Sequence, residues 1–126
     1  MGRGAPPRGV GAAMAVAAVT FLVASLVHSG ALGGLGVHDR FDGATVPELV
    51  IGVVLLAGSV PVLARSRRAR PFAAIAVGFA IVGTIVGLNF TLPTGRAGDI
   101  AYHLTILAFL VVVAGWLALT GRRSGS

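Results

Sequence analysis

The chain has 126 residues, of which 56% are hydrophobic and 11% are charged, and its formal net charge is +6. Soluble domains carry about 25% charged residues, so this composition excludes an ordinary soluble fold and indicates an integral membrane protein. The sequence contains neither cysteine nor lysine, which excludes disulfides, thiolate metal sites, iron–sulfur clusters and lysine Schiff bases within this chain.

Four apolar stretches reach or approach the ~20 residues that one helix needs to cross a bilayer. They cover residues 10–32, 46–64, 71–92 and 99–120. We therefore predict an all-α integral membrane protein, a four-helix bundle that forms a single domain over residues 1–126, with flexible tails at 1–8 and 122–126. A cleaved signal peptide is the alternative for the first stretch, but that stretch is far longer than the ~7–15 residues of a signal-peptide core.

Proline and glycine residues mark the ends of these stretches. Pro47 and Pro71 fall in the predicted first helical turns, where a missing N–H costs nothing. Pro93 follows the third stretch and Gly121 follows the fourth, which marks both as helix ends. Pro61 lies inside the second stretch and is expected to bend it.

Most arginine residues lie at one end of the predicted bundle, and all acidic residues and histidines lie at the other. The first group comprises Arg3, Arg8, Arg65, Arg67, Arg68, Arg70, Arg122 and Arg123, whereas Arg40 and Arg96 share the acidic end. By the positive-inside rule, both termini are predicted to be cytoplasmic. We expect these arginines to contact a lipid bilayer and not nucleic acid. The arginine-only, alanine- and glycine-rich composition is typical of GC-rich bacterial genomes, so we predict a multi-pass protein of the bacterial inner (plasma) membrane.

Small residues in the third stretch predict close helix packing. Gly83 and Gly87 form a GxxxG motif, for which packing inside the bundle is favoured over a homo-oligomer interface. Trp116 and Tyr102 lie toward opposite ends of the fourth stretch, as interfacial anchors do. For Tyr102 a role in a binding site is the alternative.

Each predicted helix places one polar side chain near the acidic end. His28, Asn89 and His103 lie about 6 Å inside the boundaries of their stretches, at ~1.5 Å of rise per residue, and Glu48 lies slightly shallower. Polar residues inside a membrane usually face the bundle interior and mark function. Asp99 lies four residues before His103, on the same helical face. The predicted pocket residues are therefore His28, Glu48, Asn89, Asp99, Tyr102 and His103.

A structural interpretation stands beside each of these assignments. Thr45 and Glu48 match a capping box at a helix start, and Asp99 suits an N-cap or first-turn position. Asn89 and His28 could simply hydrogen-bond between helices. A solvated loop is the favoured interpretation of His38, Asp39, Arg40 and Asp42.

Several chemistries fit a layer of histidine and carboxylate. A Zn or Fe ion could use His28, His103 and a carboxylate, and the same two histidines could be axial ligands of a b-type haem. A quinone head group or a proton could be handled without a metal, and among these alternatives a chain without any cofactor is favoured. The sequence contains no HExxH, phosphate loop or nucleophile elbow, so we assign no catalytic residue and do not expect an enzyme that acts alone.

The stretch from Pro47-Glu48-Leu49 to Gly58, followed by an arginine loop and an alanine-rich third stretch, resembles DoxX-like small membrane proteins. Glu48 matches the glutamate that opens their second span, and Gly52 and Gly58 match its glycines. The resemblance implies a four-span bundle and a subunit of membrane oxidoreductases that act on sulfur compounds and quinones. Small multidrug-resistance transporters have a carboxylate deep in the first span, and this chain has none there.

These observations favour a small membrane protein with an outward-facing polar pocket, acting as an accessory or ligand-binding subunit of a membrane redox system. Its partners would be the lipid bilayer and other membrane subunits. The alternatives are a structural scaffold, in which the polar layer only ties helices together, and a small dimeric transporter.

Overall fold

The computed structural model describes residues 4–123, and every regular element in that range is helical. The long helices are α1 (Arg8–His28), α2 (Asp42–Leu63), α3 (Ala69–Thr91) and α4 (Ala97–Arg123), with short 3-10 helices η1 (Gly33–Leu35) and η2 (Leu92–Thr94). All four long helices have the length and apolar composition of membrane spans, which suggests a multi-pass membrane protein. The outermost parts of the two predicted tails, 1–3 and 124–126, lie outside the described residues.

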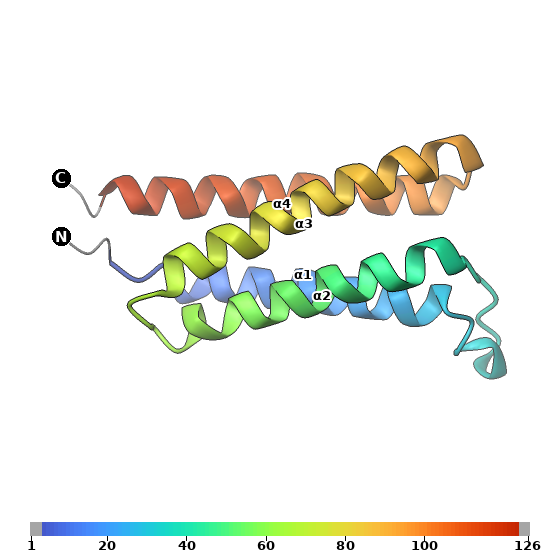
Figure 1. The fold of residues 1–126 in the computed structure, drawn as a ribbon, viewed down its shortest axis with the longest axis horizontal. Helices are drawn as coiled ribbons and strands as arrows, with labels where there is room; N and C mark the ends of the chain where they lie inside the picture. The colour runs from blue at the N-terminus through green and yellow to red at the C-terminus, as the bar shows by residue number, and fades with distance from the viewer. Residues whose placement is uncertain (1–3, 124–126) are drawn as a thin grey trace.

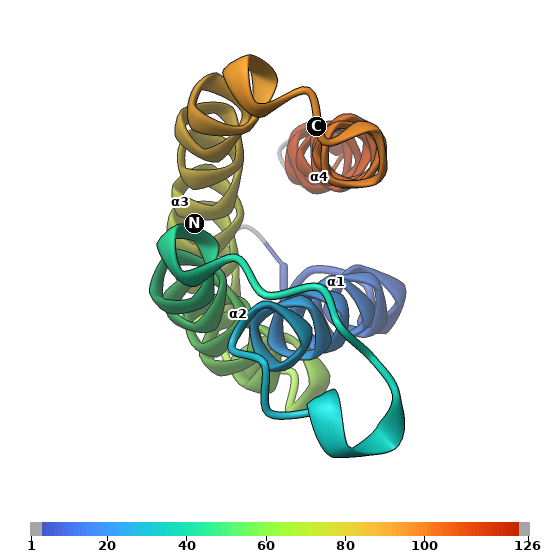
Figure 2. The same ribbon diagram turned by 90° about the vertical axis from the view of Figure 1, so that its right-hand side faces the viewer.

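The four helices run alternately up and down, so that each connection joins neighbouring helices (Figure 1). The most extensive packing follows the chain, α1 on α2, α2 on α3 and α3 on α4, whereas α1 and α4 contact each other less (Figure 2). The two ends of the described chain and the α2–α3 loop lie at one end of the bundle, here called the arginine end. The α1–α2 and α3–α4 connections lie at the opposite, acidic end (Figure 1).

Small side chains line the helix contacts, and large apolar side chains point outward. Ala17, Ala73 and Ala80 are completely buried, whereas Ile75 and Phe90 are 69% and 74% exposed. In water such a surface would be unfavourable, but a lipid environment solvates it at no cost. The buried and exposed faces are therefore arranged as expected for a bundle surrounded by hydrocarbon.

The GxxxG glycines of α3 lie on an inward face. A Cβ atom added to Gly83 would lie 2.7 Å from Ile51 Cδ1 of α2, and one added to Gly87 would lie 2.9 Å from His103 Nε2 of α4. Both distances are shorter than a normal contact of about 3.5 Å. The motif therefore serves close packing within the bundle, as favoured above.

Helix α1 ends at His28, four residues earlier than the end of the predicted span. Gly30 follows with a left-handed φ of +79°, and its N–H donates to the Val27 carbonyl at 3.1 Å. A left-handed glycine just beyond a helix is a common stop signal, because other residues pay a steric penalty there. Ala31 and Leu32 are apolar but follow the stop, so hydropathy overestimated the helix.

Helix α2 begins at Asp42, earlier than predicted, and this corrects two assignments. Pro47 lies beyond the first turn, inside the helix. The predicted capping box is wrong, because neither side chain bonds a backbone N–H at the helix start. The Thr45 hydroxyl donates to the Phe41 carbonyl at 3.4 Å, and the Glu48 carboxylate contacts His28 of α1. Pro71 and Asp99 do lie in the first turns of α3 and α4, as predicted.

The predicted helix end at Gly121 is also wrong. Gly121 is buried inside α4, which continues to Arg123. A Cβ atom at this position would lie 2.9 Å from Nη1 of Arg70. That guanidinium donates to the Leu117 carbonyl at 2.5 Å, so Gly121 provides room for Arg70 and does not end the helix.

Candidate functional site

His28 is the centre of a buried polar cluster at the acidic end, and its side chain contacts three acidic residues. Its Nδ1 lies 2.7 Å from Oε2 of Glu48 on α2, and its Nε2 lies 3.2 Å from Oδ1 of Asp99 on α4. Asp39 of the α1–α2 connection places Oδ2 at 3.7 Å from the same Nε2. His28 and Glu48 are each only 3% exposed. Three segments distant in sequence therefore converge on one imidazole ring.

Arg96 completes this group by bridging two of the carboxylates. Its guanidinium donates to Oδ2 of Asp99 and to Oδ1 of Asp39, and it lies 4.8 Å from the centre of the Phe41 ring. The hydrogen bond to Asp99 raises the pKa of Arg96 above its usual value, so the guanidinium remains charged. We call His28, Asp39, Glu48, Arg96 and Asp99 the histidine–carboxylate cluster.

The local fold holds the ring of His28 in place. As the last residue of α1, His28 accepts a hydrogen bond on its carbonyl from the Phe41 N–H at 2.9 Å. The Phe41 ring packs edge-on against the imidazole, with centroids 5.8 Å apart. Asp99 lies in the first turn of α4, where the helix dipole favours a carboxylate. The connection thus folds back over the end of α1 and covers the ring of His28.

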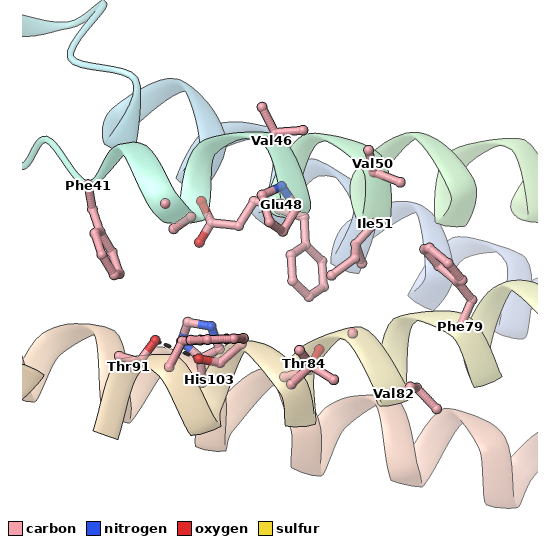
Figure 3. Close-up of a pocket in the computed structure, with 18 of the residues that line it drawn as sticks. Phe41, Val46, Glu48, Val50, Ile51, Phe79, Val82, Thr84, Thr91 and His103 are labelled. Atoms are coloured by element: carbon pink, nitrogen blue, oxygen red, sulfur yellow. Dashed lines mark hydrogen bonds between the residues drawn. The ribbon is translucent and has the colours of Figure 1, made fainter. Parts of the chain in front are cut away.

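Glu48 also borders an apolar pocket of about 730 Å³ (Figure 3). Side chains of α2 and α3 form most of its walls, and Phe21, Phe41, Phe79 and Phe90 all contribute. The hydroxyls of the lining residues Thr84, Thr91 and Thr94 donate to backbone carbonyls and are therefore already paired.

Two polar atoms at the pocket wall have no hydrogen-bond partner among residues 4–123. Oε1 of Glu48 is buried and unpaired, while Oε2 of the same carboxylate contacts His28. His103 approaches the Asp99 carbonyl with Nδ1 at 2.7 Å, so Nδ1 carries the hydrogen and Nε2 of the neutral ring is an unpaired acceptor. Figure 3 shows Glu48 and His103 on opposite walls of the pocket.

The structure brings together four of the six predicted pocket residues: His28, Glu48, Asp99 and His103. Asn89 is not among them, because it is exposed and its amide donates to the Ile85 carbonyl of its own helix at 2.9 Å. It therefore neither joins the polar layer nor connects two helices. It lies near the end of α3, but its side chain is exposed.

Tyr102 lies beside His103 but lines a different cavity. Its ring packs edge-on between Phe21 and His103, with centroids 6.0 and 5.6 Å apart. It lines a smaller cavity of about 230 Å³, which α1 and α4 form.

Sequence reasoning missed Asp39 and Arg96 as parts of the site, because both lie in or beside loops. Arg96 stands three residues before Asp99, a spacing that permits an ion pair on one helical face and was the one available signal. The contact between Arg96 and Asp39 joins residues 57 positions apart, and no feature of either local sequence predicts it.

The predicted pairing of His28 with His103 is not what the structure shows. Both ring nitrogens of His28 face carboxylate oxygens, and Nδ1 of His103 faces a backbone carbonyl. Axial ligation of a haem by both rings would require His28 to give up these contacts. The geometry therefore assigns the two histidines to different surroundings, the cluster for His28 and the pocket for His103.

No protein-family model, curated protein or solved structure was found to match this chain. The resemblance to DoxX-like proteins therefore stays a prediction from the residues around Glu48.

Proposed function

We propose that this protein is a membrane-embedded binding subunit for a lipid-soluble molecule with hydroxyl groups, and that a quinol is its ligand. The observation that carries the proposal is a pair of acceptors without a hydrogen-bond partner among residues 4–123, the buried Glu48 Oε1 and the Nε2 of His103, on the wall of an otherwise apolar pocket. Leaving a buried polar atom unpaired costs about 1–3 kcal/mol, so such atoms commonly mark the place of a ligand donor.

The polarity of these atoms selects the ligand. With the hydrogen of the shared bond on His28 Nδ1, Glu48 accepts through Oε2, and Oε1 is a second acceptor of the same carboxylate. A hydroxyl group of the ligand can donate to it or to His103. A quinone presents only carbonyl acceptors, whereas the corresponding quinol presents hydroxyl donors on an apolar ring. The pocket volume of about 730 Å³ lies within the range of roughly 300–1,000 Å³ that is usual for small-molecule sites.

The pocket walls also favour a ligand that arrives from the bilayer. Val46, Val82 and Phe90 line the pocket and are 63%, 62% and 74% exposed, so an apolar opening lies between α2 and α3. With the helices across a membrane, this opening faces hydrocarbon. We place the arginine end and both termini in the bacterial cytoplasm, in accordance with the positive-inside rule. The head group would then lie close to the outer surface.

Such a subunit would present or sense quinol for a larger membrane redox system, in accordance with the resemblance to DoxX-like proteins. The protein's own groups bind and orient the ligand, and electron transfer would belong to its partners. The apolar walls exclude water from the head group, which strengthens each hydrogen bond made there.

The test is binding of a short-chain menaquinol analogue to the purified protein in detergent, measured by anaerobic isothermal titration calorimetry. The dimethyl ether of the same quinol has the same ring but no donor, and we expect it to bind at least 10-fold more weakly. His103→Phe keeps an aromatic ring and removes the acceptor, whereas Asn89→Leu is a matched control at an exposed polar position of similar depth.

Equal binding of the quinol and its ether would contradict the proposal, and so would unchanged quinol affinity in His103→Phe. If no saturable quinol binding occurs and His103→Phe only lowers stability, the polar layer is a structural tie and the scaffold alternative stands.

A further inference from the structure

We infer that the histidine–carboxylate cluster is a divalent-metal site, with His28, Asp39 and Asp99 as its ligands. This site is separate from the quinol pocket, because it lies on the His28 side of the Glu48 carboxylate, whereas the pocket lies on the Oε1 side. It also differs from the ligand set expected from the sequence, since His103 has no part in it. The assignment does not depend on whether the pocket binds quinol.

The spacing of the donor atoms matches a metal coordination shell. His28 Nε2, one Asp39 oxygen and one Asp99 oxygen all lie within 4.8 Å of one another. Two of these separations are 3.2 and 3.7 Å. A tetrahedral ion with bonds of about 2.0–2.1 Å separates its ligands by roughly 3.4 Å. The Asp39 and Asp99 oxygens lie within 4.8 Å of each other, and Asp39, with its side chain 50% exposed, has room to move toward the ion.

Glu48 orients His28 as a metal-binding histidine is usually oriented. Its Oε2 lies 2.7 Å from Nδ1, which fixes the hydrogen on Nδ1 and directs the Nε2 lone pair toward the two aspartates. Metal-bound histidines commonly donate their second N–H to a carboxylate in this manner. A lone pair facing two carboxylate oxygens is repulsive unless a cation lies between them. The position therefore requires either a proton or a metal ion.

Arg96 contacts both aspartates without blocking the ligand atoms. It binds Oδ1 of Asp39 and Oδ2 of Asp99, and so leaves Asp39 Oδ2 and Asp99 Oδ1 directed at His28. With a neutral imidazole, the charges of one divalent ion and one guanidinium balance those of the three carboxylates. With a proton in place of the ion, the cluster keeps a net negative charge. Because His28, Glu48 and Asp99 are buried, the neutral arrangement is favoured.

The donor set selects the class of ion. One imidazole and two carboxylates suit Zn²⁺, Fe²⁺ or Mn²⁺ and disfavour soft ions such as Cu⁺. Three protein ligands also leave a fourth position for water or an external ligand, as in metal sites that interact with small molecules.

The experiment measures metal uptake by the full-length protein in detergent, without quinol. After treatment with a chelator, the protein is titrated with Zn²⁺ by calorimetry and with Co²⁺ by visible absorption, which reports tetrahedral coordination. We expect one ion per chain. Asp39→Asn changes an exposed side chain and should leave the fold intact while weakening Zn²⁺ binding at least 10-fold.

Two variants at neighbouring positions, one in the α1–α2 connection and one at the start of α2, serve as controls. Asp42→Asn alters an acid that pairs with Arg40 and lies outside the cluster, and His38→Gln alters an exposed histidine. Both should bind Zn²⁺ like the unmodified protein. No stoichiometric uptake, or equal uptake by Asp39→Asn, would overturn the assignment. Loss of binding in His38→Gln would also overturn it, because the ion would then lie on the exposed loop.

Discussion

Gly87→Ala tests whether the ring of His103 serves the pocket or only fills space. A methyl group at Gly87 would lie 2.9 Å from His103 Nε2 and 3.3 Å from Cδ2. Normal contacts of this kind require about 3.5–4.0 Å, so the ring must move by roughly 0.6 Å or more, or α3 must move away from α4. The ring is not free to swing aside, because its Nδ1 is held 2.7 Å from the Asp99 carbonyl.

The new methyl group would cover the Nε2 acceptor, so the expected effect is the loss of one hydrogen bond to the ligand. That loss is about 0.5–1.5 kcal/mol, or roughly 2- to 13-fold in the dissociation constant of the quinol. Overpacking would also lower the free energy of unfolding by about 1–3 kcal/mol, partly offset by the ~1 kcal/mol by which alanine favours a helix over glycine.

The assay is calorimetric titration with the menaquinol analogue, combined with unfolding in sodium dodecyl sulfate followed by circular dichroism. Gly78→Ala is the matched control, because it lies on the same helix and a Cβ atom there meets nothing within 4 Å. It should bind quinol normally. If Gly87→Ala loses stability but binds quinol as tightly as Gly78→Ala, His103 is a packing residue and the reasoning about the pocket is wrong.

Three further predictions concern the fold, and each is checked by the same unfolding titration. Asn89→Leu should change stability by less than about 0.5 kcal/mol, because Asn89 is exposed and bonds only to its own helix. Arg70→Met should destabilise the bundle by about 1–3 kcal/mol, because the Leu117 carbonyl loses its guanidinium donor. Gly58→Ala should cost a similar amount, because the new methyl group would overlap Ala76 and push α2 away from α3.

The helices were predictable because each combines a long apolar run with short polar connections, and their number and order follow directly. Their ends were less predictable, since they depend on backbone geometry and not on hydropathy. Gly30 ends α1 by adopting a left-handed conformation before two more apolar residues. Gly121 has the residue type of a helix stop but lies inside α4, where Arg70 occupies the space beside it.

The candidate site was predictable in depth but not in direction. His28, Glu48 and His103 lie near the same end of their helices, and position in the sequence is enough to show this. Asn89 also lies near that end of its helix, but its side chain is exposed, which depends on the rotation of α3 against its neighbours. The ion pair between Arg96 and Asp39 depends on how the α1–α2 and α3–α4 connections pack together, which no local sequence pattern predicts.

Glu48 is the one residue that belongs to both proposed sites, and Glu48→Gln should therefore reverse the ligand preference of the pocket. An amide has one acceptor oxygen, and the N–H of His28 Nδ1 requires an acceptor at 2.7 Å. Glutamine must turn its oxygen toward His28, so its NH₂ group takes the place of the unpaired Oε1 and presents donors to the pocket.

We expect the variant to bind the quinone, which offers carbonyl acceptors, more tightly than the quinol, whereas the unmodified protein should prefer the quinol. Calorimetric titration of both proteins with each member of the redox pair gives the preference as a ratio of dissociation constants. An equal loss of affinity for quinol and quinone in Glu48→Gln would show that Glu48 acts on the pocket only through the fold, and that the direction of its free oxygen does not select the ligand.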